Sequence, residues 1–371
     1  MLIDIHILQN YAPSNLNRDD TGAPKDAIFG NAQRARISSQ AIKRSIRRSE
    51  IFEAAFRASG MLARRTQRLP SLLRPLLVSL GLDEAAVDLV VARSREIGRE
   101  SGREIAKSDE AGDPETAQLI FLADDEITGL ASKLAALYRE HEHKGFEKLK
   151  IEDLTRALGA SVPRSVDIAM FGRMTTSAAF EDVHAAVQVA HAISTHKIEP
   201  EFDFYTAVDD ISGESGAGFL GDTAFNSATY YKYFSVHWEG LVTNLGGDTG
   251  VAAQGVAALI EAAAVVNPTG KQNSFAAHNV PDLVLVEARP RNVPLSYANA
   301  FLKPVWAGGQ KSLTDASTES LAAYMGKVNS LYDIPAERAW ISTNEIDLPG
   351  ATRQPSLKHL LAWLPLDREQ A

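Results

Sequence analysis

The stretch Leu2–Gln9 (LIDIHILQ) alternates apolar and polar residues and predicts a β-strand at the N-terminus. Ile3, Ile5 and Ile7 fall on one face of this strand, because successive side chains of a strand point to opposite faces. A strand of this kind can lie centrally in a sheet, so the fold is expected to be built around it.

Other elements follow from the spacing of apolar residues and from turn-forming residues. Strands are expected at Tyr230–Trp238 and, buried, at Asp282–Glu287. Helices are expected at Ser38–Ser59, Glu181–Thr195, Gly250–Val266, Leu295–Phe301, Leu313–Leu331 and Ser356–Trp363. Residues 10–36 are expected to form a long polar loop of the kind that is often functional.

The order of these elements predicts an α+β fold of ferredoxin-like type, interrupted by a large helical insertion. The sheet domain is expected to comprise residues 1–60 and 160–371, and the insertion residues 61–159, where the pattern is helical and rich in charge. A protruding hairpin is expected at residues 199–224, because Phe202, Phe204 and Tyr205 alternate with acidic residues before the glycine-rich stretch Ser212–Gly221.

The composition excludes several classes of protein. Hydrophobic residues make up 45% and charged residues 23%, as in ordinary globular chains and unlike disordered or membrane-spanning ones. The absence of cysteine excludes disulfide scaffolds, thiolate metal sites and cysteine nucleophiles. No basic segment or cleavage site suggests a signal peptide, so a cytoplasmic location and no membrane partner are expected.

The net charge of 38 − 47 = −9 hides a basic N-terminal region. Residues 1–50 hold eight Lys or Arg against five Asp or Glu, and the stretch from Arg34 to Arg48 contains no acid. Because a local field governs anion binding more than the total charge does, this region is a candidate nucleic-acid surface.

The helix that begins near Ser38 carries Gln40, Lys43 and Arg47 on one face, and Ile42 and Ile46 on the face expected to dock on the sheet. A hydroxyl residue and free N–H groups at its start favour an anion. A solvated basic face is the alternative interpretation, and the preceding loop with Arg18, Lys25 and Arg34 favours binding.

Motifs along the chain resemble the CasC-type backbone subunit of the type I-E CRISPR Cascade. The similarity is collinear over roughly residues 2–305 and poor in residues 61–155. The motifs are Asn17-Arg18-Asp19-Asp20, Lys25-Asp26-Ala27-Ile28-Phe29-Gly30, Arg36-Ile37-Ser38-Ser39-Gln40, Lys43-Arg44, Gly172-Arg173-Met174, His191-Ala192-Ile193-Ser194-Thr195-His196, Phe204-Tyr205-Thr206-Ala207-Val208-Asp209-Asp210, Lys271-Gln272 and Leu295-Ser296-Tyr297-Ala298-Asn299-Ala300-Phe301.

The resemblance implies a palm like the RNA-recognition motif (RRM-like), helical fingers and a thumb. It also implies a non-catalytic subunit that binds guide RNA (crRNA) and needs no cofactor. Its implied partners are target DNA, other Cascade subunits and further copies of itself along the RNA. The RNA-binding residues, from the resemblance and from the basic pattern together, are Arg18, Lys25, Arg34, Arg36, Ser38, Gln40, Lys43, Arg47, Met174, Phe204, Tyr205, Thr206, Lys271 and Gln272.

Residue chemistry agrees with these roles. Aromatic rings such as Phe204 stack on any base, and an apolar wedge such as Met174 can unstack a base step without reading it. Core packing is the alternative for both residues, but the acids around Phe204 argue against a buried segment. For Lys271 and Gln272 an exposed loop is the alternative.

Catalytic alternatives have weaker support. His184, His191 and His196 lack the spacing of a metal pair, and His191 is expected to pack or to cap. No phosphate-binding P-loop motif occurs. The main alternative function is a metal-dependent endoribonuclease of the related type III backbone kind, using Asp20 or Asp26. A small-molecule enzyme with a phosphate-binding loop is a third hypothesis.

Overall fold

The computed structural model describes residues 1–97, 114–116, 118–158, 165–174, 180–207 and 219–366. The chain forms two compact units. The first comprises residues 1–52, 187–238 and 253–371, and the second comprises residues 53–186 and 239–252. The second unit extends beyond the predicted insertion at 61–159, because α7 (Val166–Phe171) joins it: Val166 N donates to Met61 O, and Ala63 N donates to Asp167 Oδ1.

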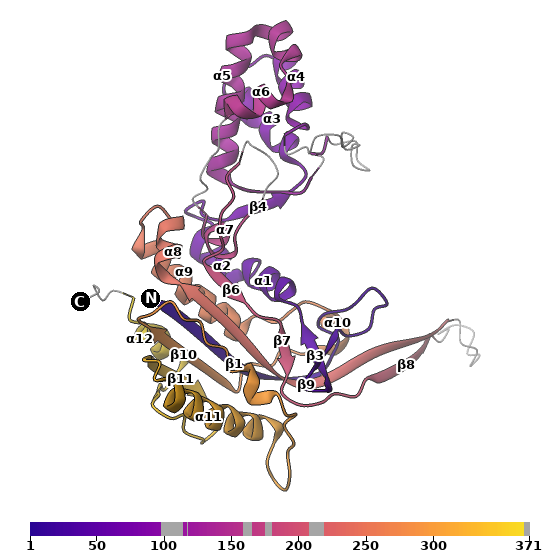
Figure 1. Cartoon of the computed structure of the whole chain (residues 1–371). Coiled ribbons are helices and arrows are strands. Elements are labelled where there is room, and N and C mark those ends of the chain that lie inside the picture. The colour runs from indigo at the N-terminus through magenta and orange to yellow at the C-terminus, as the bar shows by residue number, and fades with distance from the viewer. Residues whose placement is uncertain (98–113, 117, 159–164, 175–179, 208–218, 367–371) are drawn as a thin grey trace. The chain divides into compact units, whose positions relative to one another are not determined.

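The first unit is built on a ten-stranded sheet, which confirms an α+β fold (Figure 1). Eight strands follow the spatial order β12 (Thr352–Arg353), β11 (Glu337–Ser342), β10 (Leu283–Arg289), β1 (Leu2–Ser14), β9 (Phe219–His237), β7 (Ala192–Ser194), β3 (Ala32–Ile37) and β2 (Asp26–Phe29). Two further strands, β6 (Val187–Val189) and β8 (Glu201–Ala207), pair with β9.

The N-terminal strand lies at the centre of this sheet, as predicted. β1 pairs antiparallel with β10 through Leu2↔Arg289 to Leu8↔Leu283, and with β9 through Leu2↔His237 to Tyr11↔Ala228. Neighbours on both edges remove the free hydrogen-bonding edge that an isolated strand would present, so this strand fixes the register of the sheet.

Helices cover the sheet on both faces. The α11 helix (Leu313–Tyr332) packs Leu321 and Met325 against Leu8 and Trp340 on one face. Asn267, just after α9 (Thr249–Val265), accepts hydrogen bonds from Gln9 and Tyr11 and so belongs to the opposite face. The other helical elements with residues of this unit are α1 (Ser39–Arg47), α2 (Glu50–Phe56), α8 (Trp238–Asn244), α10 (Gln272–Phe275), η1 (Ala298–Phe301) and α12 (Leu357–Trp363).

The second unit has a helical core of its own. Its helices α3 (Leu69–Ser79), α4 (Glu84–Ser94), α5 (Asp124–Lys148) and α6 (Ile151–Leu158) bury Leu73, Val90, Leu134 and Phe146 together. The sequence pattern missed a two-stranded sheet here, in which β4 (Ala63–Thr66) pairs with β5 (Ile120–Ala123).

Three predictions of local structure differ from the structure. Residues 10–36 are not a single loop: β1 continues to Ser14, and residues 26–37 form the β2–β3 hairpin. Residues 181–195 are not a helix, because β6 and β7 pair with β9, and pairing in the tertiary fold overrides local preference. The predicted helix from Ser38 to Ser59 is split into α1 and α2 by Arg48 and Ser49.

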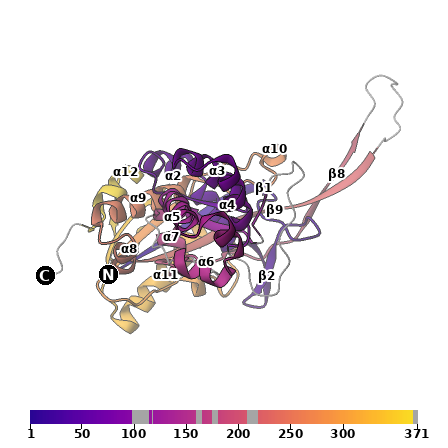
Figure 2. The ribbon, with the colours of Figure 1, turned by 90° about the horizontal axis from the view of Figure 1, so that it is seen from above.

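The predicted hairpin around residues 199–224 is present. β8 pairs with the first part of β9 from Glu201↔Phe225 to Ala207↔Phe219, and Figures 1 and 2 show this pair leaving the sheet as a long projection. Residues 208–218, which include most of the glycine-rich stretch, lie outside the described residues. Of the helices in the described part of the chain, none combines the length and apolar character needed to cross a membrane.

Candidate nucleic-acid interface

The start of α1 is fixed by its own sequence. Ser38 caps the helix, its hydroxyl accepting from Ala41 N, and Ser38 N donates to Asn17 Oδ1 at 2.9 Å. Ile42 and Ile46 are buried, as the predicted apolar stripe requires. Because no acid occupies the first turn and Arg44 and Arg47 lie in the last, α1 is a cationic helix anchored on its apolar side.

The cations of α1 occupy two flanks. Gln40 is exposed, while Lys43 and Arg47 are half-buried, and burial lowers the pKa of Lys43. Arg44 is exposed on the other flank. The predicted RNA-binding residues include Lys43 and Arg47 but not Arg44, although the i, i+3 spacing from Ala41 to Arg44 could have identified a second face.

A hollow of about 670 Å³ lies beside that second flank. The loop from Leu16 to Gly22 forms one wall, Ala41, Arg44 and Ser45 form another, and Pro268–Gly270 closes it. The walls approach closely at Gly270, where an added Cβ would lie 2.3 Å from Leu16 O, so only glycine fits.

The loop that lines the hollow is held by side-chain hydrogen bonds. The Asp19 carboxylate accepts from Thr21 Oγ1 at 2.8 Å, Thr21 N at 2.9 Å and Ala23 N at 3.0 Å. These bonds, the Thr21 hydroxyl first, lower the pKa of Asp19. Asn15 Nδ2 donates both to Gly22 O at 2.9 Å and to Ala224 O in β9 at 3.0 Å, which ties the loop to the base of the hairpin.

The hairpin presents aromatic rings to solvent. Phe202 and Phe204 are 66% and 67% exposed and share a face, since strand residues two apart point the same way. Tyr205 is 45% exposed on the opposite face, and Thr206 is exposed on the Phe204 face. No Lys or Arg occurs between residues 198 and 231, so the hairpin can contact a nucleic acid through these aromatic rings but not through cationic side chains.

Lys271 and Gln272 lie at the base of the hairpin. Lys271 Nζ is 3.5 Å from Thr223 Oγ1, and Thr223 shares the hairpin face of Tyr205. The Gln272 amide donates to Pro268 O and Ala277 O, and its Oε1 is buried. The prediction for Gln272 is therefore corrected: its side chain holds its own loop together and is not available to a ligand.

Arg34 is a second correction. Its side chain is fully buried, and its guanidinium donates to the carbonyl oxygens of Ser194, Phe301 and Leu302 and, through Nε, of Phe29. Because its N–H groups donate to main-chain carbonyls in the interior, the Arg34 guanidinium cannot reach a phosphate in solvent. Arg18, by contrast, is exposed at the rim of the hollow.

Met174 belongs to the second unit, where the residues before it fix its position. Arg173 is buried, with Nη1 2.7 Å from Glu126 Oε2 and 3.1 Å from Phe121 O. Gly172 has φ +78°, and an added Cβ would lie 2.9 Å from Val183 O. The Met174 side chain itself is 96% exposed, so core packing, the alternative interpretation, is wrong for it.

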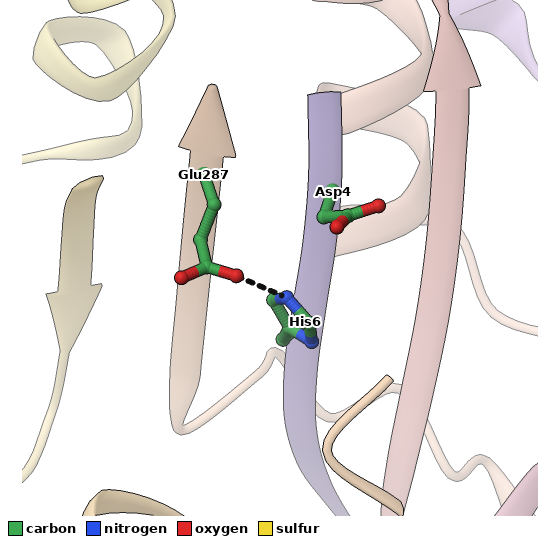
Figure 3. A group of neighbouring side chains, drawn as sticks. All are labelled: Asp4, His6 and Glu287. Carbon is green, nitrogen blue, oxygen red and sulfur yellow. Dashed lines mark hydrogen bonds and ion pairs between the residues drawn. The ribbon is translucent and has the colours of Figure 1, made fainter. Parts of the chain in front are cut away.

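A buried cluster in the sheet, Asp4, His6 and Glu287, has the composition of a metal site (Figure 3). Its ligand atoms are already engaged. His6 Nδ1 is 2.8 Å from Tyr231 Oη and its Nε2 is 3.1 Å from Glu287 Oε2. Tyr233 Oη donates to Asp4 at 2.9 Å.

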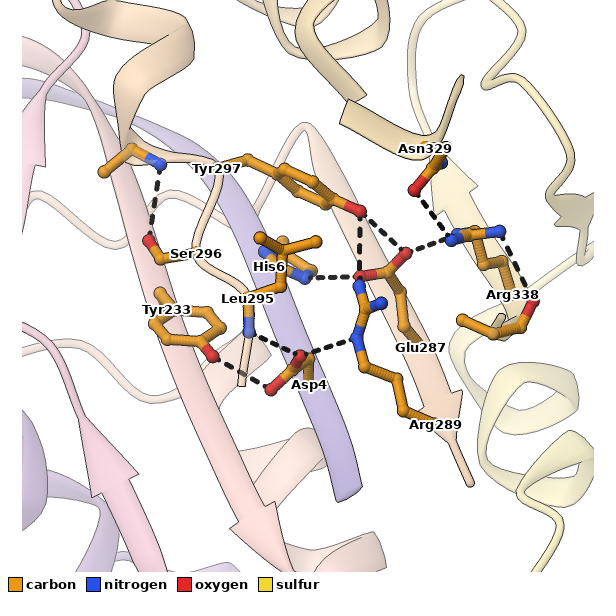
Figure 4. A network of polar contacts seen from close by, with 12 residues as sticks. Asp4, His6, Tyr233, Glu287, Arg289, Leu295, Ser296, Tyr297, Asn329 and Arg338 are labelled. Atoms are coloured by element: carbon orange, nitrogen blue, oxygen red, sulfur yellow. Dashed lines mark hydrogen bonds and ion pairs between the residues drawn. The ribbon is translucent and has the colours of Figure 1, made fainter. Parts of the chain in front are cut away.

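The buried guanidinium of Arg289 and the half-buried one of Arg338 complete this network (Figure 4). Arg289 contacts both carboxylates, and Arg338 contacts Glu287. Burial raises the pKa of Glu287, but His6, Arg289 and Arg338 outweigh it and lower the pKa to about 2. Two cations balance two carboxylates, so the cluster is a structural network with no net negative charge left to attract a metal cation.

Comparison with known proteins identifies the family of the chain. A family model described as CT1975-like protein matches residues 3–363. The chain belongs to the CT1975-like family. A comparison with curated proteins gives no match.

Two solved structures are similar over nearly the whole chain. One, titled a CRISPR RNA-guided surveillance complex, pre-nicking, is 30% identical, with a TM-score of 0.82. Another, titled a CRISPR RNA-guided surveillance complex, is 27% identical, with a TM-score of 0.72. In both cases the similarity covers 98% of this chain and 99% of the other.

Proposed function

We propose that this CT1975-like chain is a non-catalytic subunit that binds crRNA and forms the backbone of a cytoplasmic, type I-E Cascade-like surveillance complex. Copies of the chain bind along one guide RNA, beside other Cascade subunits. The complex recognises target DNA by base pairing to the guide, while the protein supplies a channel matched to charge and shape.

One observation carries this proposal. In the first unit, Asn15 joins the loop that carries Arg18, next to the cationic helix α1, to the base of a hairpin whose exposed aromatic rings lie among acids. Cations hold a phosphate backbone without reading sequence, and exposed rings stack on any base. A subunit that must accept every guide sequence needs both features. Similarity to chains of RNA-guided surveillance complexes supports it.

The contacts of the acidic residues favour a binding role over cleavage. The Asp19 carboxylate accepts hydrogen bonds from Thr21 and Ala23 within its own loop. Asp26 accepts from Gln33 Nε2 within the β2–β3 hairpin. Asp20 lines the hollow. It is therefore the residue that the test of cleavage must address.

The full-length chain should be expressed alone and with a transcript that carries CRISPR repeats. We expect a particle much larger than the 40.2 kDa chain, a high ratio of absorbance at 260 to 280 nm, and RNA whose spacer sequence is arbitrary. Elution as a single chain without nucleic acid in both cases would overturn the proposal and favour a small-molecule enzyme.

Cleavage is tested on the assembled particle with bound target RNA and Mg²⁺. We expect the target to stay intact. Cuts at regular intervals that disappear in Asp20→Ala or Asp26→Ala would overturn the non-catalytic assignment while leaving RNA binding in place.

A further inference from the structure

Three groups that can bear positive charge meet beside the β2–β3 hairpin of the first unit. Arg36 N donates to Lys25 O at 2.9 Å, which places these two residues opposite each other at the start of the hairpin. Arg36 also pairs with Ile193 of β7, and its Nη1 lies 3.1 Å from Nδ1 of the exposed His191. His191 therefore neither packs in the interior nor caps a helix, contrary to the sequence-based expectation.

Lys25 and Arg36 form a pair of like charges. Residues directly opposite in an antiparallel ladder share a face, and like charges in such a pair are destabilising. Arg36 Nε donates to the main-chain carbonyl of Asp26, and neither Lys25 nor Arg36 forms an ion pair within the described part of the chain. A bound anion would relieve the repulsion between them.

The contact between Arg36 and His191 also restricts the protonation of His191. A guanidinium can only donate, so Nδ1 of His191 must accept and therefore carries no proton. Burial, then the charges of Arg36 and Lys25, lower the pKa of His191. Protonating Nδ1 would set two donors against each other, unless an anion entered and accepted from both.

We propose that Lys25, Arg36 and His191 form a subsite for one backbone phosphate of the bound RNA, and that His191 takes up a proton when this phosphate binds. The inference rests on the proposed function, since the phosphate belongs to that RNA. Binding and proton uptake are linked, so the affinity for RNA rises as the pH falls through the range in which His191 titrates.

The test uses the full-length chain, freed of nucleic acid by nuclease and high salt, and a fluorescein-labelled oligouridylate. Dissociation constants are measured by fluorescence anisotropy at constant ionic strength between pH 7.5 and 5.5. For the wild-type chain we expect the dissociation constant to fall about three- to tenfold, because a pKa that rises by one on binding changes affinity tenfold.

The deciding variant is His191→Gln. The Gln amide oxygen can still accept from Arg36 but does not titrate. We expect affinity within about twofold of wild type at pH 7.5 and a loss of the gain at pH 5.5. His141→Gln, an exposed histidine on α5 in the second unit, is the matched control and should keep the wild-type profile.

Each result separates the two proposals. A His191→Gln profile that still follows the wild-type curve overturns the phosphate subsite but leaves RNA binding intact, and so does a wild-type affinity that is constant with pH. If no form of the chain binds the RNA at any pH, the proposed function fails as well. Lys25→Ala gives a second readout, since it should weaken binding at every pH and reduce the gain.

Discussion

Arg289 Nε lies 2.9 Å from Asp4 Oδ2, and both side chains are fully buried in the central sheet. The same guanidinium reaches Glu287 on its own strand, so one cation serves two carboxylates (Figure 4). The two acids come from β1 and β10, whose pairing sets the register of the sheet. The ion pair therefore joins the first strand of the chain to β10, and the two paired residues are 285 positions apart in the sequence.

Removing Arg289 should destabilise the first unit strongly. Arg289→Met leaves Asp4 without its cation, and breaking a buried pair costs about 3–5 kcal/mol. All four Trp residues lie in the first unit, so tryptophan fluorescence during urea unfolding reports its free energy of unfolding.

The matched control for this prediction is Lys311→Met. Lys311 pairs with Glu319 in solvent, with side chains 57% and 45% exposed, and such pairs contribute about 0–1 kcal/mol. Equal unfolding midpoints for the Arg289 and Lys311 variants would contradict the view that the buried network holds the sheet together.

Lys232 should make stability depend on pH. Its ammonium is buried, donates to Gln9 Oε1 and lies 5.6 Å from the centre of the Tyr11 ring. Burial lowers the pKa of Lys232 from 10.5 to about 7. Between pH 7 and 9.5 the unfolded chain binds more protons than the folded one, so the free energy of unfolding should rise by up to about 1.4 kcal/mol per pH unit.

The measurement is urea unfolding by tryptophan fluorescence in steps from pH 7 to 9.5, below the range in which the buried tyrosines titrate. Lys232→Met removes the titrating group and should flatten the slope, whereas Lys311→Met should keep it. A wild-type slope that persists in Lys232→Met would assign the pH dependence to another group.

The sequence predicts the parts of the fold that have a local pattern. Alternation in Leu2–Gln9 identified the central strand, and apolar spacing identified α9 and α11. The β2–β3 hairpin was not predicted, because Ala32–Ile37 contains few strand-forming residues. Its position also depends on Arg34, which donates hydrogen bonds to carbonyl oxygens about 160 and 270 residues away in the sequence. Such distant partners leave no trace in a local pattern.

The candidate site shows the same division. The sequence shows the clustered cations and the aromatic residues of the hairpin, but it does not show which of these side chains face solvent. Arg34 and Arg36 are two residues apart on one strand, yet Arg34 is fully buried while Arg36 contacts His191 at the surface. Only the position of the neighbouring strands decides between them.

The two flanks of α1 should contribute separately to RNA binding. Lys43→Ala combined with Arg47→Ala should weaken binding to all sequences alike, and Arg44→Ala should do the same from the side of the hollow. Each phosphate that the protein no longer neutralises reduces the slope of log affinity against log salt by about 0.7 for a single strand. Dissociation constants for oligouridylate over a range of salt concentrations give this slope.

Lys358→Ala on α12 is the control for α1, since it removes one exposed cation elsewhere in the first unit. Its slope should equal that of the wild type. If Arg44→Ala alone lowers the slope, RNA runs along the hollow. If none of the α1 variants changes it, α1 does not hold phosphates.

Phe204 should contribute to RNA binding by stacking and very little to folding. Its ring is 67% exposed, so Phe204→Ala should change the free energy of unfolding by less than about 0.5 kcal/mol. Loss of one base stack costs about 1–3 kcal/mol of binding, roughly a five- to 150-fold rise in the dissociation constant.

Phe204→Trp should bind like the wild type, whereas Phe204→Leu should resemble the Ala variant, because only a ring can stack. Leu331→Ala, which removes a residue 78% exposed on α11, should leave the affinity unchanged. Full affinity in Phe204→Leu would show that the hairpin offers an apolar surface and not a stacking platform.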